Sequence, residues 1–400
     1  MQFLTDFLQQ VKMSNLYRQT VTYNPVSADH VELQDKKYLL LASNNYLGLT
    51  HDEVVRQAAI EAVQLYGTGS GGARLTTGTY PLFDELEEEL ARFKGTEAAL
   101  VFNTGYMANL GVISALAEPG DVIFSDELNH ASIIDGCRLS RAQIVVYRHA
   151  DMEHLQTLLK NTVCQGKRLI ITDGVFSMDG DIAPMGEIAQ LAEQYGAIVV
   201  VDDAHATGVI GKNGKGTAAY FGVHTKVQVQ IGTLSKALGS EGGFVAGSKE
   251  LIDYIRNKAR SFIFSTALAP ATIAASLAAL RQVKVRPELV ATLWENGRYM
   301  RELLRAAHLP ILAGETPIIP ILVGEAETAV RLTEELKQQG IILTAIRPPT
   351  VPAGTSRLRL TVTAAHKREE LAWAAEQIAA ACKVGKVNIG KQVGITCRMF

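Results

Sequence analysis

Several polar residues of catalytic type stand directly after apolar runs of this sequence. Lys236 lies within Thr-Leu-Ser-Lys-Ala-Leu-Gly at 233–239, and Asp202 ends a valine-rich run and is followed closely by His205. Taken singly, an aspartate after a strand is commonly a turn or cap residue, and a lysine is usually solvated. Several such residues on one edge of a sheet favour a ligand site instead, because ligands of open α/β sheets bind at the carboxyl ends of the strands.

Further polar segments follow the same pattern. Gly105 and Tyr106 come after an apolar run and open a helical pattern, whose first N–H groups could hold a phosphate. His130 and Ser177 each stand a few residues past another apolar run. Coincidences on successive strands are harder to dismiss than one, so we expect these residues to share a site.

A lysine and an aspartate on neighbouring strands, beside a phosphate-holding helix, match the needs of pyridoxal phosphate (PLP). The lysine amine attaches the aldehyde, a carboxylate keeps the pyridine nitrogen protonated, and backbone N–H and hydroxyl groups hold the phosphate. The separation of Asp202 and Lys236 along the chain allows one connection between two strands, so both can face one crevice. These residues therefore predict a PLP site.

The elements that must position these residues alternate between β-branched runs and helical patterns, which is typical of a mostly parallel sheet covered by helices. The predicted strands are 98–103, 121–125, 144–147, 168–173, 197–202, 227–232 and 243–246, and the predicted helices between them are 106–117, 131–139, 152–160 and 185–195. The fold class predicted is α/β, with a large doubly wound, mostly parallel sheet domain.

The rest of the chain predicts a smaller α+β domain toward the C-terminus. Its elements are a helical stretch at 277–307, a strand at 318–323, a helix that ends at Gly340, strands at 341–346 and 357–363, and a helix at 367–381. We expect an N-terminal helix with small strands over 1–44, a large PLP-binding domain over 45–282, a small domain over 283–384 and a loose tail over 385–400.

Composition narrows the class of protein. The chain has 400 residues, 47% of them hydrophobic, and a formal net charge of -2, so no global field favours nucleic acid or an anionic membrane. No apolar run is long enough for a membrane span, and four cysteines without a CxxC pair fit a reducing compartment. We expect a cytoplasmic protein with no nucleic-acid or membrane partner.

A nicotinamide-dependent enzyme is a competing interpretation. Gly67, Gly69 and Gly72 match the dinucleotide fingerprint G-x-G-x-x-G. That motif needs a strand before it, whereas the pattern before Gly67 is helical. We therefore interpret these glycines as a loop that allows close backbone approach.

A metal site is a second competing interpretation. Asp202, Asp203 and His205 could supply ligands, but no second histidine or cysteine stands at ligand spacing. We expect no metal.

Four motifs together resemble those of the α-oxoamine synthases, which are PLP enzymes of fold type I. They are Asn-Asn-Tyr-Leu-Gly at 44–48, Phe-Ser-Met-Asp-Gly at 176–180, Asp-Asp-Ala-His-Ala-Thr-Gly at 202–208 and Thr-Leu-Ser-Lys-Ala-Leu-Gly at 233–239. The resemblance covers residues 15–382 approximately. It implies a fold type I PLP-dependent transferase that joins an amino acid to an acyl thioester with loss of carbon dioxide.

The resemblance also implies roles at the cofactor. Lys236 would bind the aldehyde and then act as general base. Asp202 would pair with the ring nitrogen, His205 with the phenolic oxygen, and His130 would stack on the ring. The further cofactor contacts implied are Gly105, Tyr106, Ser177 and Thr233, with Ser265 and Thr266 supplied by the partner subunit of a homodimer with shared active sites.

Substrate contacts are implied in the same way. Arg359 matches the family's anchor for the amino-acid carboxylate, which favours a bidentate guanidinium partner. The alternative is that Arg357 and Arg359 alternate on a solvated strand face. The remaining substrate contacts expected are Asn44 and, toward the acyl substrate, Arg18, Arg347 and Thr350.

The segment Ile-Arg-Pro-Pro-Thr-Val-Pro at 346–352 is most similar to family members that condense L-alanine with a pimeloyl thioester on the way to biotin. Whether coenzyme A or an acyl carrier protein bears the acyl group stays open, and glycine C-acetyltransferase is the nearest alternative activity. Another PLP reaction, such as transamination or β-elimination, would share the lysine, the aspartate and the fold.

Overall fold

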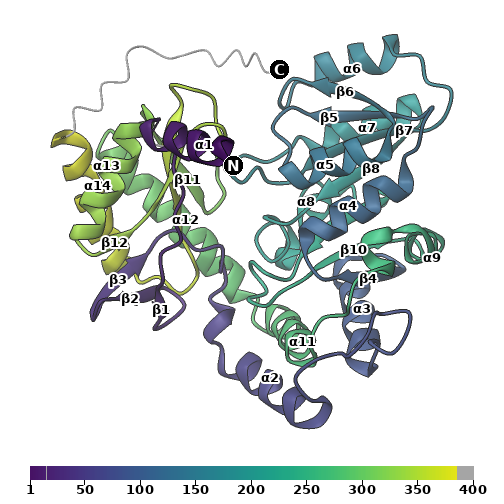
Figure 1. The fold of residues 1–400 in the computed structure, drawn as a ribbon, viewed down its shortest axis with the longest axis horizontal. Helices are drawn as coiled ribbons and strands as arrows, with labels where there is room; N and C mark the ends of the chain where they lie inside the picture. Colours follow the sequence, from purple (N-terminus) through teal and green to yellow (C-terminus); the bar gives the residue numbers. More distant parts are fainter. Residues whose placement is uncertain (15, 385–400) are drawn as a thin grey trace. The chain divides into compact units, whose positions relative to one another are not determined.

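The computed structural model describes residues 1–14 and 16–384 (Figure 1). The chain divides into two compact units, and each is described by itself. Unit 1 comprises Met1–Asn44, Met178–Gly180 and Leu293–Phe400, and unit 2 comprises Asn45–Ser177 and Asp181–Thr292. The tail predicted at 385–400 lies outside the described residues.

Unit 2 contains a seven-stranded sheet with the strand order β4-β10-β9-β8-β7-β5-β6. The strands are β4 (Ala98–Phe102), β5 (Val122–Asp126), β6 (Gln143–Tyr147), β7 (Arg168–Asp173), β8 (Ala197–Asp202), β9 (Val229–Thr233) and β10 (Gly243–Gly247). The strands β6, β5, β7, β8 and β9 pair in parallel, whereas β10 is antiparallel to both of its neighbours. The predicted mostly parallel sheet is confirmed.

Helices cover both faces of this sheet (Figure 1). One face packs against α4 (Gly105–Leu116), α5 (Ala131–Ser140), α9 (Lys249–Lys258) and α10 (Arg260–Ile263), and the other against α6 (Met152–Asn161) and α7 (Met185–Tyr195). Along β8, Val200 belongs to the first apolar cluster, while Val199 and Val201 belong to the second. A valine-rich run therefore makes this strand because both of its faces are buried.

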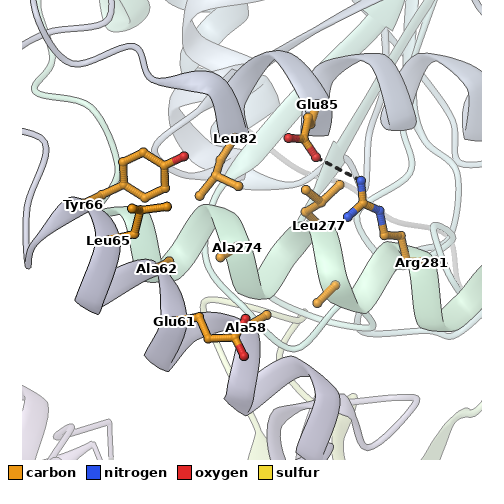
Figure 2. A pocket seen from close by; sticks show the side chains of 11 residues that line it. Ala58, Glu61, Ala62, Leu65, Tyr66, Leu82, Glu85, Ala274, Leu277 and Arg281 are labelled. Atoms are coloured by element: carbon orange, nitrogen blue, oxygen red, sulfur yellow. Dashed lines mark hydrogen bonds and ion pairs between the residues drawn. The ribbon is translucent and has the colours of Figure 1, made fainter.

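Unit 2 has six further helical elements among the described residues, and three of them, α2, α3 and α11, pack together. The six are η1 (Leu49–His51), α2 (Glu53–Tyr66), α3 (Pro81–Lys94), η2 (Lys212–Gly214), α8 (Thr217–Tyr220) and α11 (Pro270–Val285). The Asp52 side chain caps α2 by accepting from the N–H groups of Val54 and Val55. Pro81 opens α3, and Gly95 ends it in the left-handed region. Figure 2 shows α2, α3 and α11 packed around a shallow groove.

The helical stretch predicted at 277–307 is wrong in one respect, because it is broken. It comprises the end of α11 and α12 (Glu288–Ala306), and the backbone leaves the helical region at Arg286, with φ -123° and ψ 63°. Pro287 follows, and a proline disfavours helical geometry in the residue before it.

Unit 1 contains two small sheets and the helices that pack with them. The first sheet comprises β1 (Asn24–Pro25), β2 (His30–Leu33), β3 (Lys36–Leu40) and β12 (Ile341–Ile342), and the second comprises β11 (Ile318–Gly324), β14 (Ser356–Thr361) and β13 (Thr344–Ile346). The helices are α1 (Gln2–Met13), α13 (Ala326–Gln338) and α14 (Arg368–Val384). The predicted α+β character is confirmed.

The single strand predicted at 341–346 is also wrong. It is two strands in different sheets, since β12 pairs in parallel with β3 and β13 pairs antiparallel with β14. Leu343 joins them and is buried. The apolar run carries no turn residue at this point, so the sequence pattern did not reveal the change of sheet.

Within the part of the chain that the structure describes, no helix has both the length and the apolar character of a membrane span.

Candidate active site

The carboxyl ends of the parallel strands of unit 2 carry a row of buried polar residues. Asp126, Asp173, Asp202 and Thr233 are the last residues of β5, β7, β8 and β9, and each is less than one-tenth exposed. Asp173 and Asp202 face each other in the β7–β8 register. Buried carboxylates need hydrogen-bond donors or cations, so their partners define the site.

Asp202 accepts hydrogen bonds on both oxygens. Oδ1 accepts from the N–H of Ala204 at 2.8 Å, and Oδ2 accepts from Nδ2 of Asn109, on α4, at 2.6 Å. Donors of this kind stabilise a charged carboxylate. The sequence prediction did not name Asn109, although it is a polar residue within the mostly apolar helix α4.

Lys236 belongs to the same electrostatic cluster as Asp202. Burial and the neighbouring charge of Asp202 raise the pKa of Asp173 well above its usual range, while the Lys236 ammonium acts in the opposite direction. The charges of Asp202 and Lys236 also act on His130. The structure therefore brings Lys236, Asp202 and His130 together, as the sequence predicted.

His130 caps the N-terminus of α5 and is held from two sides. Its backbone N–H donates to Oδ2 of Asp173 at 2.7 Å, and its ring Nδ1 lies 2.7 Å from the Ser132 hydroxyl. Burial lowers the pKa of His130, and the Lys236 charge adds to this effect while Asp202 opposes it. A neutral imidazole at this position follows.

His205 is oriented by a tyrosine that the sequence prediction did not assign. The hydroxyl of Tyr46 lies 2.7 Å from Nδ1 of His205, and both side chains are buried. The two rings also meet edge to face. Tyr46 belongs to the Asn-Asn-Tyr-Leu-Gly motif, so the sequence marked this residue but did not reveal that it contacts His205.

A candidate anion cradle lies where α4 begins. The Thr104 side chain accepts from the N–H of Met107, and the first two N–H groups of the helix are those of Gly105 and Tyr106. A Cβ at Gly105 would lie 3.4 Å from Cβ of Thr233, so the end of β9 and the start of α4 are adjacent. Backbone N–H groups beside a hydroxyl suit a phosphate.

Hydroxyl groups and a glycine complete this corner. Oγ1 of Thr233 lies 2.7 Å from Oγ of Ser235 and donates to the Gly242 carbonyl at 2.7 Å. A Cβ at Gly243 would overlap the backbone of Gly105, at 2.6 Å from its nitrogen. Gly243 therefore allows close approach of the protein backbone at the start of α4.

Tyr106 and Ser177 lie at different depths in unit 2. Tyr106 is 41% exposed, its hydroxyl donates to Asp135, and its ring meets the His130 ring edge to face. Ser177 follows β7 and is half-buried. Tyr106 thus contacts one side of the candidate site, as expected for a residue at the start of α4.

The glycine segment of unit 2 supports another loop. Gly67 ends α2 with φ 82°, so a helix precedes the motif and the dinucleotide interpretation is wrong. The N–H of Ala267 donates to the Gly72 carbonyl at 2.9 Å, and Ala73 bridges to Thr266. The segment that carries Ser265 and Thr266 is therefore anchored on the glycine loop.

Asp203 has a structural role that argues against a metal at this motif. Its Oδ2 lies 2.7 Å from Nζ of Lys94, and both side chains are fully buried. The Thr217 hydroxyl donates to Oδ1 at 2.6 Å. Asp203 is thereby saturated by donors, while its neighbour Asp202 faces Asn109.

A further histidine, which the sequence prediction missed, follows β6 and contacts the end of β5. Nδ1 of His149 lies 3.0 Å from Asp126 and Nε2 lies 2.8 Å from Asp181. Burial lowers the pKa of His149, but the two carboxylates outweigh it and raise this pKa to about 10. His149 is therefore a cation that ties the loop after β7 to β5.

The arginines of β14 in unit 1 are buried. Arg357 is 3% exposed and pairs with Asp179 at 2.6 Å, and Arg359 is 6% exposed. Nη2 of Arg359 donates to Oδ1 of Asn44 at 3.2 Å, and Nη1 donates to the Thr361 hydroxyl. The solvated strand face considered for these arginines is therefore wrong, and two predicted substrate residues, Asn44 and Arg359, are in contact.

The three residues expected at the acyl substrate come from two segments of unit 1 that are in contact. Nη2 of Arg347 donates to the Tyr17 carbonyl at 3.2 Å, which brings it to the segment of the exposed Arg18. The N–H of Thr350 donates to the Arg347 carbonyl in a turn. The pairing of the 17–18 segment with the 347–350 turn could not be foreseen from spacing.

Comparisons with known proteins agree with this geometry. A family model described as aminotransferase class I and II matches residues 36–378. The chain is 47% identical to an 8-amino-7-oxononanoate synthase from Lysinibacillus sphaericus and 50% identical to one from Geobacter sulfurreducens, over 97% of this chain and 98% of each relative.

Solved structures give the same result for the fold. A serine palmitoyltransferase from S. paucimobilis, with a bound PLP–myriocin aldimine, matches with a TM-score of 0.92 at 33% identity, covering 96% of this chain and 98% of that one. An 8-amino-7-oxononanoate synthase from Francisella tularensis matches with a TM-score of 0.75 at 30% identity, covering 87% and 98%. The fold type I architecture predicted from the motifs is confirmed. The chain belongs to the class I and II aminotransferase family and, within it, to the α-oxoamine synthases.

Proposed function

We propose that this chain catalyses the PLP-dependent condensation of L-alanine with a pimeloyl thioester, which releases carbon dioxide and thiol and gives 8-amino-7-oxononanoate for biotin biosynthesis. The observation that carries the proposal is the gathering of Lys236, Asp202 and His130 at the carboxyl edge of the sheet. The names of relatives with 47% and 50% identity supply the product. A cytoplasmic location is part of the proposal.

The residues present fit PLP. A buried, hydrogen-bonded carboxylate at Asp202 suits a protonated pyridine nitrogen, and the amine of Lys236 acts on the same cluster. The start of α4, with the N–H groups of Gly105 and Tyr106, supplies donors for a phosphate dianion, and the Thr233 side chain lies next to Gly105. The donor set therefore matches each end of the cofactor.

When bound, PLP supplies an electron sink for negative charge that develops at the α-carbon of the amino acid. Around it, Lys236 would hold the aldehyde and later move the α-proton on its Nζ. Asp202 would keep the ring nitrogen protonated, and His205, oriented by Tyr46, would hold the phenolic oxygen. Ser177 and Tyr106 would complete the contacts.

For the amino-acid substrate we propose Arg359 as the carboxylate partner, with Asn44 holding its guanidinium. Arg357, the other arginine of β14, already pairs with Asp179, so it is not available to bind a substrate carboxylate in the same way. A buried guanidinium binds a carboxylate strongly because little water competes. It would thereby fix which α-bond aligns with the cofactor ring.

For the acyl substrate we propose Arg18, Arg347 and Thr350. The hydrogen bond from Arg347 to the backbone beside Arg18 supports one shared contact region in unit 1. Two cations suit an anionic acyl tail or a phosphorylated carrier arm. Coenzyme A and an acyl carrier protein both present such a group, so the experiment below supplies both donors.

We propose a homodimer with shared active sites, in which Ser265 and Thr266 contact the partner's cofactor phosphate. Support comes from large apolar side chains of unit 2 that are left exposed, such as Phe264 at 71%, directly before that segment, and Leu65 at 73% on α2. Figure 2 shows Leu65 at the groove that α2 forms with Leu82 and Leu277, where Arg281 pairs with Glu85. Exposed apolar area of this kind is typical of an interface.

The test is mass spectrometry of the product from PLP-loaded protein given L-alanine, glycine or L-serine with pimeloyl, acetyl or palmitoyl thioesters, the pimeloyl group being offered both on coenzyme A and on an acyl carrier protein. We expect 8-amino-7-oxononanoate from L-alanine and the pimeloyl donor. Preferred use of glycine with the acetyl donor would assign glycine C-acetyltransferase activity. The high TM-score to serine palmitoyltransferase makes the serine arm necessary. An amine transfer without carbon–carbon bond formation would reject the proposal.

A further inference from the structure

The amide of Asn109 joins two residues that the proposed function places on opposite parts of the cofactor ring. Its Nδ2 donates to Oδ2 of Asp202 at 2.6 Å and to Oγ of Ser132 at 2.8 Å. Oγ of Ser132 in turn lies 2.7 Å from Nδ1 of His130. Asp202, Asn109 and Ser132 are each less than 5% exposed, so this part of the chain is shielded from water, whereas His130 at its end is exposed.

The direction of each hydrogen bond follows from chemistry. An ionised carboxylate can only accept, so the Asn109 atom that faces Asp202 must be the nitrogen. The backbone N–H of Ser132 also points at Nδ1 of His130, at 3.2 Å, and a backbone N–H can only donate. Nδ1 therefore carries a lone pair, the Ser132 hydroxyl donates to it, and the ring proton of neutral His130 lies on Nε2.

The other amide atom shows that this orientation has a cost. Oδ1 of Asn109 is buried and has no hydrogen-bond partner among the described residues. An unsatisfied buried carbonyl is unfavourable, and such a group is seldom kept without a reason. Here the amide nitrogen donates to both Asp202 and Ser132, and this orientation turns the amide oxygen away from both of them.

We propose that Asn109 is a positioning residue which, through Ser132, holds His130 as the neutral Nε2–H imidazole and at the same time fixes the carboxylate of Asp202 for the cofactor's ring nitrogen. The inference rests on the proposed function, because the two ends of the chain matter together only if a cationic ring lies between them. Protonation of His130 would require a hydrogen on Nδ1, directed at two donors. The chain thus keeps a second positive charge away from Lys236 and Asp202 stays the ring's counter-ion.

The groups that face His130 come from several elements. Asp202 and Asp173 lie at the ends of β8 and β7, Lys236 follows β9, and the Tyr106 ring from α4 meets its edge. None of these groups acts on His130 through the Ser132 hydroxyl. A change at His130 in a variant without this hydroxyl therefore reports the hydroxyl itself.

The first readout is the protonation state of His130 in the full-length protein before PLP is added. NMR of protein labelled at the histidine rings gives it, with the His130 signal assigned by His130→Gln. We expect Nε2–H in the wild type, and we expect Ser132→Ala to raise the pKa of His130 by about one unit, the worth of one hydrogen bond. Ser132→Thr, which keeps the hydroxyl, should restore the wild-type value.

The second readout is the affinity for PLP relative to its 1-deaza analogue, in which carbon replaces the ring nitrogen. Asn109→Leu should reduce the preference for PLP by about tenfold, because the Asp202 carboxylate loses one donor. Ser132→Ala should leave that preference unchanged, since it keeps the contact between Asn109 and Asp202. Ser114→Ala, which also removes a serine hydroxyl but on the helix that carries Asn109, should change neither readout.

The outcomes separate the two proposals. An unchanged His130 pKa in Ser132→Ala, or equal weakening of both coenzyme forms by Asn109→Leu, would overturn the positioning role. Failure of the wild type to bind either coenzyme form would instead reject the proposed function. In that case the NMR measurement would still decide whether the hydrogen-bonded chain sets the state of His130.

Discussion

Two histidines at the same edge of one sheet are held in opposite charge states. His149, just past the end of β6, lies between the carboxylates of Asp126 and Asp181 and is a cation. His130, one strand connection earlier in the chain, meets N–H and O–H donors from Ser132 and stays neutral. The comparison teaches that burial alone does not set the charge of a histidine. The chemical type of its hydrogen-bond partners does.

The difference matches two kinds of task. The cation at His149 ties a loop to the sheet, which is a structural task. The neutral ring at His130 lies in the cluster of Lys236 and Asp202, where the proposed function needs a single anion and an uncharged face. The predictions below test each region in turn.

The largest effect is expected at the catalytic region. Asp202→Asn should lower kcat/KM for the condensation by about 10²- to 10³-fold, because the electrostatic partner of the ring nitrogen is lost. The matched control is Asp173→Asn on the neighbouring strand. Burial already raises the pKa of Asp173, so the loss of its charge should cost less than about tenfold. Equal losses in the two variants would contradict the assignment.

Substitutions around His149 should lower the stability of the fold and not the catalytic rate. His149→Leu leaves the nearly buried Asp126 without its cation, and we expect the free energy of unfolding to fall by about 3 kcal/mol. Urea unfolding followed by circular dichroism measures it. Arg148→Ala removes a neighbouring exposed pair with Asp151 and should cost about 0–1 kcal/mol. A loss as small in His149→Leu would show that the pair is not a buried one.

The pH dependence sharpens the same point. The pKa of His149 is about 10 in the folded protein against an ordinary value of 6.5, so the folded state binds more protons than the unfolded state between these values. The stabilisation by His149 is therefore complete below pH 6.5 and is lost as the pH rises toward 10. The difference in unfolding free energy between wild type and His149→Leu should shrink over that range, and a constant difference would contradict it.

The smallest effect concerns the third histidine. Tyr46→Phe removes the hydroxyl beside Nδ1 of His205, and we expect kcat/KM to fall by about tenfold, which corresponds to one hydrogen bond. Tyr254→Phe, whose hydroxyl contacts the Ala115 carbonyl, is the control and should be silent in activity. Identical behaviour of the two variants would mean that Tyr46 serves only packing.

Sequence reasoning succeeded where function and strand order coincide. Asp202, Lys236 and His130 could be grouped because each follows an apolar run, and the carboxyl ends of parallel strands meet at one edge. The architecture of unit 2 followed from the same alternation. The glycine motif at 67–72 was also correctly set aside, because the helix before it is visible as a periodic pattern.

The supporting residues could not be predicted in the same way. Asn109 and Ser132 make their contacts through the packing of α4 against α5 and β8, and nothing in their spacing names these partners. The pairing of His149 with Asp181 likewise depends on where a loop folds back. The change of sheet at Leu343 left no turn residue, so its apolar run looked like one strand.

The central claim is that Lys236 carries PLP at the end of the sheet beside Asp202. The direct measurement is reduction of the PLP-loaded protein with borohydride, which fixes the cofactor on the amine that holds it, followed by peptide mass spectrometry. We predict one pyridoxyl label per chain, on Lys236, and its loss in Lys236→Ala together with the near-visible absorbance band. A label on a different lysine, or an unlabelled wild type, would contradict the account.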